Sequence, residues 1–510
     1  MMKNPFSFFL KKSLLTFCIF LFTSLIMQAQ DLPEIKKHDP SLIGKGTTLD
    51  GIKQGLWNYF NEEGILLESG HYAGEERTGL WIFFDEQQQK AAQIDYDSLY
   101  YREFFPNGDI AGQGALTDKL EKTGLWTYYH LSEKIWAQGQ YRDGKQTGEW
   151  LFWYAEGNKN AEVAMDNGIT TWWYPDGTVE MTGPVKAGQL DGEWSYYYTS
   201  GTLREKSVFK EGKKEGASRL YYENGNPEFE GNFKEGLLNG FSMWYYEDGQ
   251  LESAGKSVMD VQDSTWTYYF QNGNTSSEGD FVNGKENGVW TFLYTTGEKL
   301  RQGPMVDGQR HGEWTTWYPG GEISHQGPFV NDQEYGTWTS WYDNGQMQDR
   351  GTFTRGKMDE LWEGWFANGT KRYEVRYVNG ERHGLSSHWY ENGKARQSAN
   401  YENGLNHGIW IRWQDNGNML EEGQFTQGER SGLWVYYDGS GTKYREQEYS
   451  ASKAHGHFTT FYPDGSKEQE GYFVEGQRHG NWTYWDPEGK VIRTMQFDRG
   501  KMVNQKDYNR

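Results

Sequence analysis

Residues 338–361 read WTSWYDNGQMQDRGTFTRGKMDEL, and this stretch decides the fold because related copies of it fill most of the chain. Further copies follow without a gap, with WEGWFANG at Trp362 and SSHWYENG at Ser386. From Thr170 to Trp482 a new copy begins every 24 residues. Earlier copies, spaced by 20, 24 or 25 residues, begin at Trp57, Trp81, Tyr101, Trp126 and Trp150. A fixed period of this length indicates a repeat architecture.

The repeat accounts for nearly the whole chain. Nineteen blocks cover residues 44–505 of the 510, which leaves no room for another domain. Residues 31–43 are interpreted as a linker and residues 506–510 as a tail. Glycine contributes 65 residues and aromatic residues 17%, a combination of tight turns and large rings that argues against disorder.

Each block contains the signals of a β-hairpin. We number a block from position 0, which is Trp in 13 of the 19 blocks, and position 3 is aromatic in 18. Position 7 is usually a glycine that follows Asn or Asp, as in Asn344-Gly345. Asn-Gly between two strand-like runs favours a two-residue type I′ turn. The sequence therefore predicts an all-β fold, an elongated, solenoid-like array of consecutive antiparallel β-hairpins in a single twisted or curled sheet.

A turn centred between positions 6 and 7 predicts which residues face one another. Position 0 should face position 13, so that each Trp ring lies across a strand glycine, and position 15 should face the glycine two residues before the Trp. Position 4 should face position 9. Examples of the three pairings are Trp338 with Gly351, Trp314 with Gly327 and Trp266 with Gly279; Phe353 with Gly336; and Tyr198 with Leu203 and Tyr342 with Met347.

Position 3 lies on the other face of the predicted sheet. Its neighbour at position 1 is often Thr or Ser and position 10 is often charged, so this face should be wet. Aromatic residues at position 3 would then form a ladder on a polar surface. Five consecutive rungs are tryptophan, and we predict that they bind a partner together with two arginines at position 10. These residues are Trp317, Trp341, Trp365, Trp389, Trp413, Arg372 and Arg396. Packing inside a rolled or dimerised sheet is the alternative role for the rings.

The block resembles the MORN repeat, most closely the 24-residue bacterial variant that is often labelled an antitoxin component. Gly-x-Trp, a Tyr/Trp pair, Asn-Gly and a glycine series recur, and the Arg-His-Gly element of the family stands at residues 310–312, 382–384 and 478–480. The resemblance implies a sheet of hairpins that binds partners and has no catalysis of its own. Among the blocks that depart from the pattern, four replace the first Trp with Thr or Ser: Thr170, Ser218, Ser242 and Ser386.

The start of the chain predicts export. Residues 1–30 contain Lys3, Lys11 and Lys12, no acidic residue, and an apolar run from Leu14 to Ile26. That run is too short for a membrane span and suits a signal peptide. We therefore expect the protein in the periplasm or at the cell surface, where its single cysteine, Cys18, would be removed with the signal peptide.

Catalysis, cofactors and metals are not predicted. The chain has no phosphate-binding glycine loop, no Gly-x-Ser-x-Gly and no His-Glu-x-x-His motif. Five histidines share one position before a turn glycine, but successive hairpins are too far apart to share one ion. They are interpreted as polar turn residues. These histidines are His311, His383, His407, His455 and His479.

Together these features predict a non-catalytic exported scaffold that binds a protein or peptide along the aromatic ladder. A glycan, stacked on Trp faces, is the alternative ligand, and an antitoxin-like role applies if the protein is cytoplasmic. The net charge of −21 argues against nucleic acid, because phosphate binding needs clustered Lys and Arg. Homo-oligomerisation and direct membrane association stay open at this stage.

Overall fold

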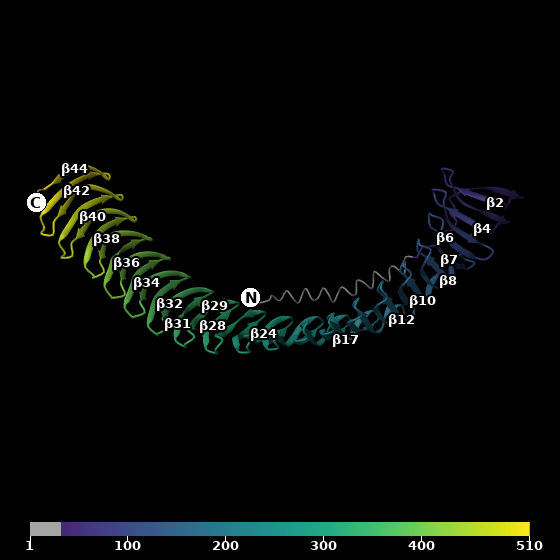
Figure 1. Ribbon diagram of the computed structural model, residues 1–510, viewed down its shortest axis with the longest axis horizontal. Coiled ribbons are helices and arrows are strands. Elements are labelled where there is room, and N and C mark those ends of the chain that lie inside the picture. The colour runs from purple at the N-terminus through teal and green to yellow at the C-terminus, as the bar shows by residue number, and fades with distance from the viewer. Residues whose placement is uncertain (1–31, 509–510) are drawn as a thin grey trace. The chain divides into compact units, whose positions relative to one another are not determined.

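The computed structural model describes residues 32–508 and divides the chain into two units, residues 1–237 and residues 238–510. The described residues form 44 β-strands and no helix. The strands pair antiparallel with their nearest neighbours in chain order, as the ribbon shows within each unit (Figure 1), and strands that flank a two-residue strand also pair with each other. The predicted all-β class built from consecutive hairpins is confirmed. The predicted signal peptide, residues 1–30, lies outside the described residues.

The first unit contains β1 (Ile43–Leu49), β2 (Ile52–Phe60), β3 (Leu66–Ala73), β4 (Glu76–Phe84), β5 (Lys90–Asp95), β6 (Tyr100–Phe104), β7 (Ile110–Leu116), β8 (Lys122–Tyr129), β9 (Ile135–Arg142), β10 (Lys145–Trp153), β11 (Lys159–Ala164), β12 (Asn167–Trp173), β13 (Val179–Lys186), β14 (Gln189–Leu190), β15 (Gly192–Tyr197), β16 (Leu203–Lys210), β17 (Lys213–Tyr221) and β18 (Pro227–Lys234). The short strand β19 (Leu237–Leu238) falls at the division between the units.

The second unit contains β20 (Gly240–Tyr245), β21 (Leu251–Val258), β22 (Val261–Tyr269), β23 (Thr275–Val282), β24 (Lys285–Leu293), β25 (Lys299–Val306), β26 (Gln309–Arg310), β27 (Gly312–Trp317), β28 (Ile323–Val330), β29 (Gln333–Glu334), β30 (Gly336–Trp341), β31 (Met347–Thr354), β32 (Lys357–Trp365), β33 (Lys371–Val378), β34 (Glu381–Trp389), β35 (Ala395–Glu402), β36 (Leu405–Trp413), β37 (Met419–Thr426), β38 (Glu429–Tyr437), β39 (Lys443–Ser450), β40 (Lys453–Phe461), β41 (Lys467–Val474), β42 (Gln477–Trp485), β43 (Val491–Asp498) and β44 (Lys501–Asp507).

The predicted register is correct away from the turn and wrong beside it. Trp338 pairs with Gly351 and Gly336 pairs with Phe353, as the sequence predicts. Met347, however, pairs with Trp341 instead of Tyr342, because the register shifts after Ser340. The same shift makes Tyr197, not Tyr198, the partner of Leu203. Position 9 therefore joins position 3 on one face, and position 10 bulges out of the ladder.

The cause is the turn type, which is not I′. The amide of Gly345 donates to the carbonyl of Tyr342 at 2.9 Å, and the amide of Tyr342 donates to the carbonyl of Gln346 at 2.9 Å. Only Gly345 has a left-handed backbone, with φ of +81°; Asn344 does not. This is a three-residue loop, a type I turn closed by a left-handed glycine.

The side chain of Asn344 links its turn to the turn of the next block. Its amide nitrogen donates to the carbonyl of Ala367, in the loop of the next block, at 2.9 Å. Asn392 makes the equivalent bond to Asp415 at 2.7 Å. Position 6 thus links successive hairpin loops, which explains why Asn recurs there although no positive φ is required.

The tryptophans at position 0 form the core on one face of the sheet. Each ring lies over the glycine of the preceding block, whereas the sequence predicted coverage of the glycine in its own hairpin. A Cβ added to Gly327 would lie 2.4 Å from the Trp338 ring, and one added to Gly351 would lie 2.1 Å from Trp362. At these two positions bare glycine backbone therefore admits the indole of the next block.

Hydrogen bonds and edge-on ring contacts extend this core from block to block. The indole N–H of Trp338 donates to the carbonyl of Pro328 at 3.1 Å, and that of Trp362 donates to Thr352 at 3.0 Å. Phe353 stands edge-on between the two indoles, with ring centroids 6.2 Å from Trp338 and 4.9 Å from Trp362. The core is therefore a ladder in which each block packs on its neighbours.

Candidate functional site

The sheet presents two chemically different faces. The tryptophan face carries positions 0, 2, 11, 13 and 15, and the stripe face carries positions 3 and 9, because side chains alternate along each strand. In β8, for example, Trp126 and Tyr128 are buried while Thr127 and Tyr129 are half-buried. The partner-binding residues predicted from sequence can be placed against these two faces.

The stripe face brings the five predicted tryptophans into one row, and all five are half-buried. The backbone carbonyls of four of them accept a hydrogen bond from the tyrosine at position 4 of the preceding block. The hydroxyl of Tyr318 donates to the carbonyl of Trp341 at 2.9 Å, and that of Tyr342 donates to Trp365 at 3.0 Å. The row consists of Trp317, Trp341, Trp365, Trp389 and Trp413.

Residues at position 9 lie between the rungs of this row. The ammonium of Lys299 lies 5.5 Å from the centre of the Trp317 ring, and that of Lys371 lies 5.2 Å from the centre of Trp365. Met347 pairs directly with Trp341. The stripe thus alternates rings with aliphatic and cationic side chains, which explains why the indoles are only half-exposed.

The two predicted arginines, Arg372 and Arg396, have different surroundings. The Arg372 guanidinium donates to the carboxylate of Asp349 at 2.8 Å and lies against Tyr373, whose ring covers Gly364 on the tryptophan face. Arg396 is exposed, and its guanidinium lies 5.9 Å from the centre of the Tyr390 ring. Position 10 bulges, so its side chain is free to reach the tryptophan face.

Sequence reasoning missed a row of polar residues on the tryptophan face of the second unit. Position 2 is aromatic in most blocks, but in the five consecutive blocks from 314 to 433, all with Trp at position 3, it is Thr316, Ser340, Gly364, His388 and Arg412. The register places one residue per strand in a continuous row from β31 to β37. In order across the strands the row reads Asp349, Gly364, Tyr373, His388, Gln397, Arg412 and Glu421. The sequence signal for this row was that position 2 loses its aromatic residue in the same run of blocks in which position 3 is always Trp.

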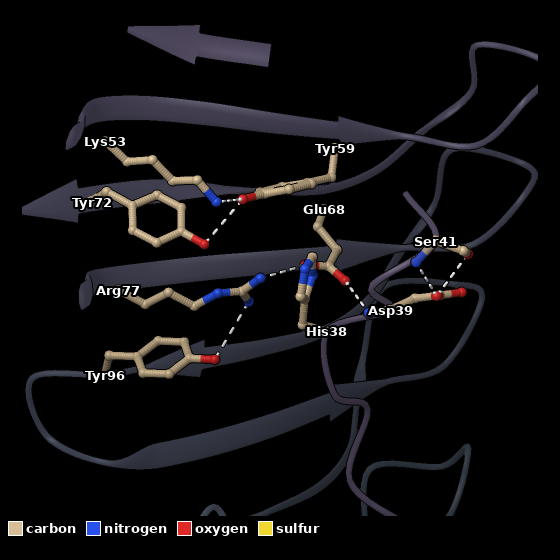
Figure 2. A network of polar contacts seen from close by, with 9 residues as sticks. All are labelled: His38, Asp39, Ser41, Lys53, Tyr59, Glu68, Tyr72, Arg77 and Tyr96. Carbon is tan, nitrogen blue, oxygen red and sulfur yellow. Dashed lines mark hydrogen bonds and ion pairs between the residues drawn. The ribbon is translucent and has the colours of Figure 1, made fainter. Parts of the chain in front are cut away.

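The second site that sequence reasoning missed is the N-terminal strap, residues 32–42, which had been interpreted as a linker. It lies on the tryptophan face of the first unit (Figure 2). His38 Nδ1 lies 2.8 Å from a Glu68 carboxylate oxygen, and the Asp39 amide donates to the other oxygen at 3.1 Å. Arg77 donates to the same carboxylate at 2.9 Å. The buried Glu68 therefore receives two groups from the strap and one from the sheet.

The rest of the strap follows the same face without a helix or turn between Leu32 and Asp39. The Lys36 amide donates to the Tyr101 hydroxyl at 3.2 Å. Lys122 Nζ donates to the carbonyl of Pro33, and the Leu32 side chain is buried. The tryptophan face of this unit thus holds an extended stretch of polypeptide through apolar, backbone and charged contacts.

The tryptophan face of the first unit contains a buried ion pair. Glu205 and Lys214, 2% and 3% exposed, are joined by a contact of 2.6 Å between Glu205 Oε1 and Lys214 Nζ. Burial by itself would raise the pKa of the Glu205 carboxyl. The charge of Lys214, together with hydrogen bonds from Lys214 and Ser207, outweighs burial and lowers this pKa. Glu205 therefore carries its negative charge in the folded chain at neutral pH.

Replacing Glu205 with Gln should destabilise the first unit by about 3 kcal/mol at pH 7, because it leaves a buried ammonium without its counter-charge. A carboxyl whose pKa is lower in the folded chain stabilises it above the unfolded pKa of 4.5. That contribution disappears as the pH falls through the lower, folded value. The gap between wild type and variant should therefore shrink below pH 4.5 in urea unfolding. Glu193→Gln, which removes the exposed partner of Lys206, serves as the control and should have little effect. A gap that stays constant with pH would contradict the ion-pair account.

Metal-binding and membrane-spanning features were searched for in the same residues. Within residues 32–508, no group of three or more His, Cys, Asp or Glu side chains is placed to hold a metal ion. No helix in this part of the chain is long and apolar enough to cross a membrane.

Comparisons with solved structures and curated proteins add little. The chain aligns with the crystal structure of TcdB2-TccC3-Cdc42 at 11% identity over 89% of its length and 28% of that chain, with a TM-score of 0.13. The values for TcdB2-TccC3-TEV are 12%, 86%, 28% and 0.12. The chain thus spans less than a third of these chains, and such TM-scores carry no argument. No curated protein matches the chain.

The family comparison is informative, because its matches repeat with the period of the hairpins. A model described as a MORN repeat variant matches eight segments in both units. These are residues 190–211, 214–235, 310–331, 334–354, 382–403, 406–427, 454–475 and 478–499. Each matched segment contains position 0 of one block and the hairpin loop that follows it. The protein is therefore a MORN-like repeat protein.

Proposed function

We propose that the protein is an exported, non-catalytic repeat scaffold that binds a protein or peptide partner along the stripe from Trp317 to Trp413. The observation that carries this proposal is that five consecutive indoles are half-exposed in one row on a face that also carries Thr315, Thr339 and Ser387. Exposed apolar stripes with a polar rim usually mark binding sites, and tryptophan contributes strongly at interfaces.

The backbone geometry supports the same proposal. Tyrosine hydroxyls fix the carbonyls of Trp317, Trp341, Trp365 and Trp413 at 2.8 to 3.0 Å. The rungs are therefore presented by a rigid sheet, and a partner would not have to order them on binding. Export is inferred from the basic and apolar residues at the start of the chain, and it would bring the stripe into contact with envelope or extracellular proteins.

Replacing Trp341, Trp365 and Trp389 together with Ser tests the stripe. Half-exposed side chains contribute less to the core than buried ones, so the melting temperature should fall by only a few degrees, while binding of the partner should be lost. The partner is first isolated from envelope extract with the purified chain and identified, and its affinity for each variant is then measured by calorimetry.

The matched control replaces Trp153, Trp173 and Tyr197, which occupy position 3 in the first unit. It removes three equivalent rings and should leave the affinity unchanged. If instead the triple variant in the second unit unfolds, the rings belong to the core, where truncation of each Trp costs about 3–5 kcal/mol. Retention of a glycan in place of a protein would reassign the stripe to carbohydrate.

A further inference from the structure

The polar row on the tryptophan face of the second unit carries an uncompensated positive charge at its centre. At its two ends the charges are balanced, because Asp349 pairs with Arg372 at 2.8 Å and Glu421 pairs with Arg412 at 2.6 Å. His388 stands between these ends, in register with Tyr373 on one side and Gln397 on the other. This balance leaves the middle of the row without a carboxylate of its own.

Two further arginines belong to this centre. Arg382 donates to the Tyr401 hydroxyl at 3.3 Å and lies over the Tyr401 ring, and Arg396 lies over the ring of Tyr390. Within residues 32–508, neither guanidinium lies within ion-pair distance of a carboxylate. Burial lowers the pKa of the His388 imidazole, and the nearby charges of Arg382, Arg396 and Arg372 lower it further. Such a cluster is unexpected in a chain of net charge −21.

Block 386–409 also lacks the indole that the two neighbouring blocks place on this face at Trp362 and Trp410. Ser386 replaces the Trp at position 0, and its hydroxyl lies 3.2 Å from His388 Nε2. Val375 and Ala399, its partners on the two adjacent strands, replace the usual glycines and are buried beside it. A small hydroxyl residue therefore stands where the neighbouring blocks place a large apolar ring.

In the first unit, the corresponding row of residues on the tryptophan face contacts the strap. The strap lies along the equivalent row there, in which Tyr59, Glu68, Phe83, Ala92 and Glu103 follow one another across the strands. His38 of the strap meets the sheet carboxylate of Glu68. Burial raises the pKa of the Glu103 carboxyl, and the charges of Lys122 and of Lys36 of the strap act against that rise. Acidic groups of the row thus face basic groups of the bound segment.

We propose that the tryptophan face around His388 is a second binding site, which takes an extended, acidic segment of a partner polypeptide. The segment would follow the row as the strap follows its own, and its carboxylates would meet Arg382 and Arg396. The charge pattern is the reverse of that in the first unit, with the cations on the sheet and the anions on the occupant. Guanidinium and carboxylate groups pair through two parallel hydrogen bonds, which favours this chemistry. The site lies on the face opposite the stripe and does not depend on the stripe's function.

A peptide derived from the strap tests the proposal on the full chain. The probe is a fluorescein-labelled peptide with the sequence of residues 32–42 in which Lys36, Lys37 and His38 are replaced with Glu. It should bind the purified protein in anisotropy measurements, with an affinity that falls as salt is added. The unmodified peptide, which carries basic groups at these positions, should bind much more weakly. Equal binding of both peptides would overturn the charge assignment.

Site-directed variants locate the binding. Arg382→Gln with Arg396→Gln should weaken binding of the acidic peptide by about tenfold or more, since two charge-assisted hydrogen-bonding partners are lost. Arg350→Gln with Arg376→Gln is the matched control, because both arginines are exposed and stand at positions 12 and 14, on the side of the stripe face. The control should keep the affinity within about twofold.

Three outcomes would overturn the proposal. Equal losses in the two double variants would show attraction to net charge without a site. Full affinity in Arg396→Gln alone, the variant least able to disturb folding, would remove that arginine from the site. Displacement of the peptide by inorganic phosphate at low concentration would assign the cluster to a small anion instead of a polypeptide.

Discussion

A chain that lacks residues 266–277 should lose the fold of its second unit, whereas a chain that lacks residues 266–289 should fold. The longer deletion removes one whole block and joins Thr265 to Trp290, so that every strand keeps its role and Trp290 takes the place of Trp266 over Gly255. Because the stability of such an array is a sum of block and neighbour terms, one block fewer changes it little.

The shorter deletion removes only positions 0 to 11 of the block. It joins the start of β22 to the end of β23, and the strand that should carry Trp266 now carries Gly279 and Phe281. Circular dichroism and urea unfolding of both variants measure the outcome. The period assignment would be wrong if the two deletions had the same effect, because nothing else distinguishes 12 residues from 24.

Replacing Gly351 with Val should be among the most destabilising single substitutions in the second unit. A Cβ at this position would lie 2.1 Å from the Trp362 ring, and the indole cannot retreat because its N–H is bonded to Thr352 and its edge faces Phe353. Overpacking of this kind costs about 1–3 kcal/mol, and loss of the indole contact with the strand adds to that value.

Gly439→Ala is the matched control for this substitution. Gly439 is exposed, its backbone is not left-handed, and a Cβ added there would meet no atom within 4 Å. The control should leave the urea midpoint unchanged, whereas Gly351→Val should lower it. A neutral Gly351→Val would mean that the tryptophans do not depend on bare backbone at position 13.

Much of the fold could be predicted from the sequence, because the period fixes where strands and turns recur. The pairing of Trp338 with Gly351 follows from counting residues around the turn. What counting could not reveal is the geometry of the turn itself. Asn-Gly is compatible with a type I′ turn and with a type I turn followed by a left-handed glycine, and the same turn forms at Asp464-Gly465, so the residue before the glycine does not decide between the two.

The candidate sites were predicted less completely for a related reason. The five tryptophans share one position, so the period alone places them in one row. Arg372 was harder to place, since a bulge releases position 10 from the alternation of strand faces, and its partner Asp349 belongs to the preceding block. The strap carries no repeat signal, and only folding brings His38 to Glu68, 30 residues away in sequence.

The order of the strands has a mechanical consequence. Each strand of the second unit pairs with its nearest neighbours in chain order, and β25 with β27 and β28 with β30 also pair past a two-residue strand. A force applied to the two ends of that unit therefore acts along the ladder of backbone hydrogen bonds. Every pair of neighbouring strands then carries the same force, because the pairs are connected in series. The weakest hairpin therefore opens first. Such a sheet should extend by releasing one hairpin at a time at low force, and it should recoil when the tension is removed, because each released hairpin refolds against an intact neighbour.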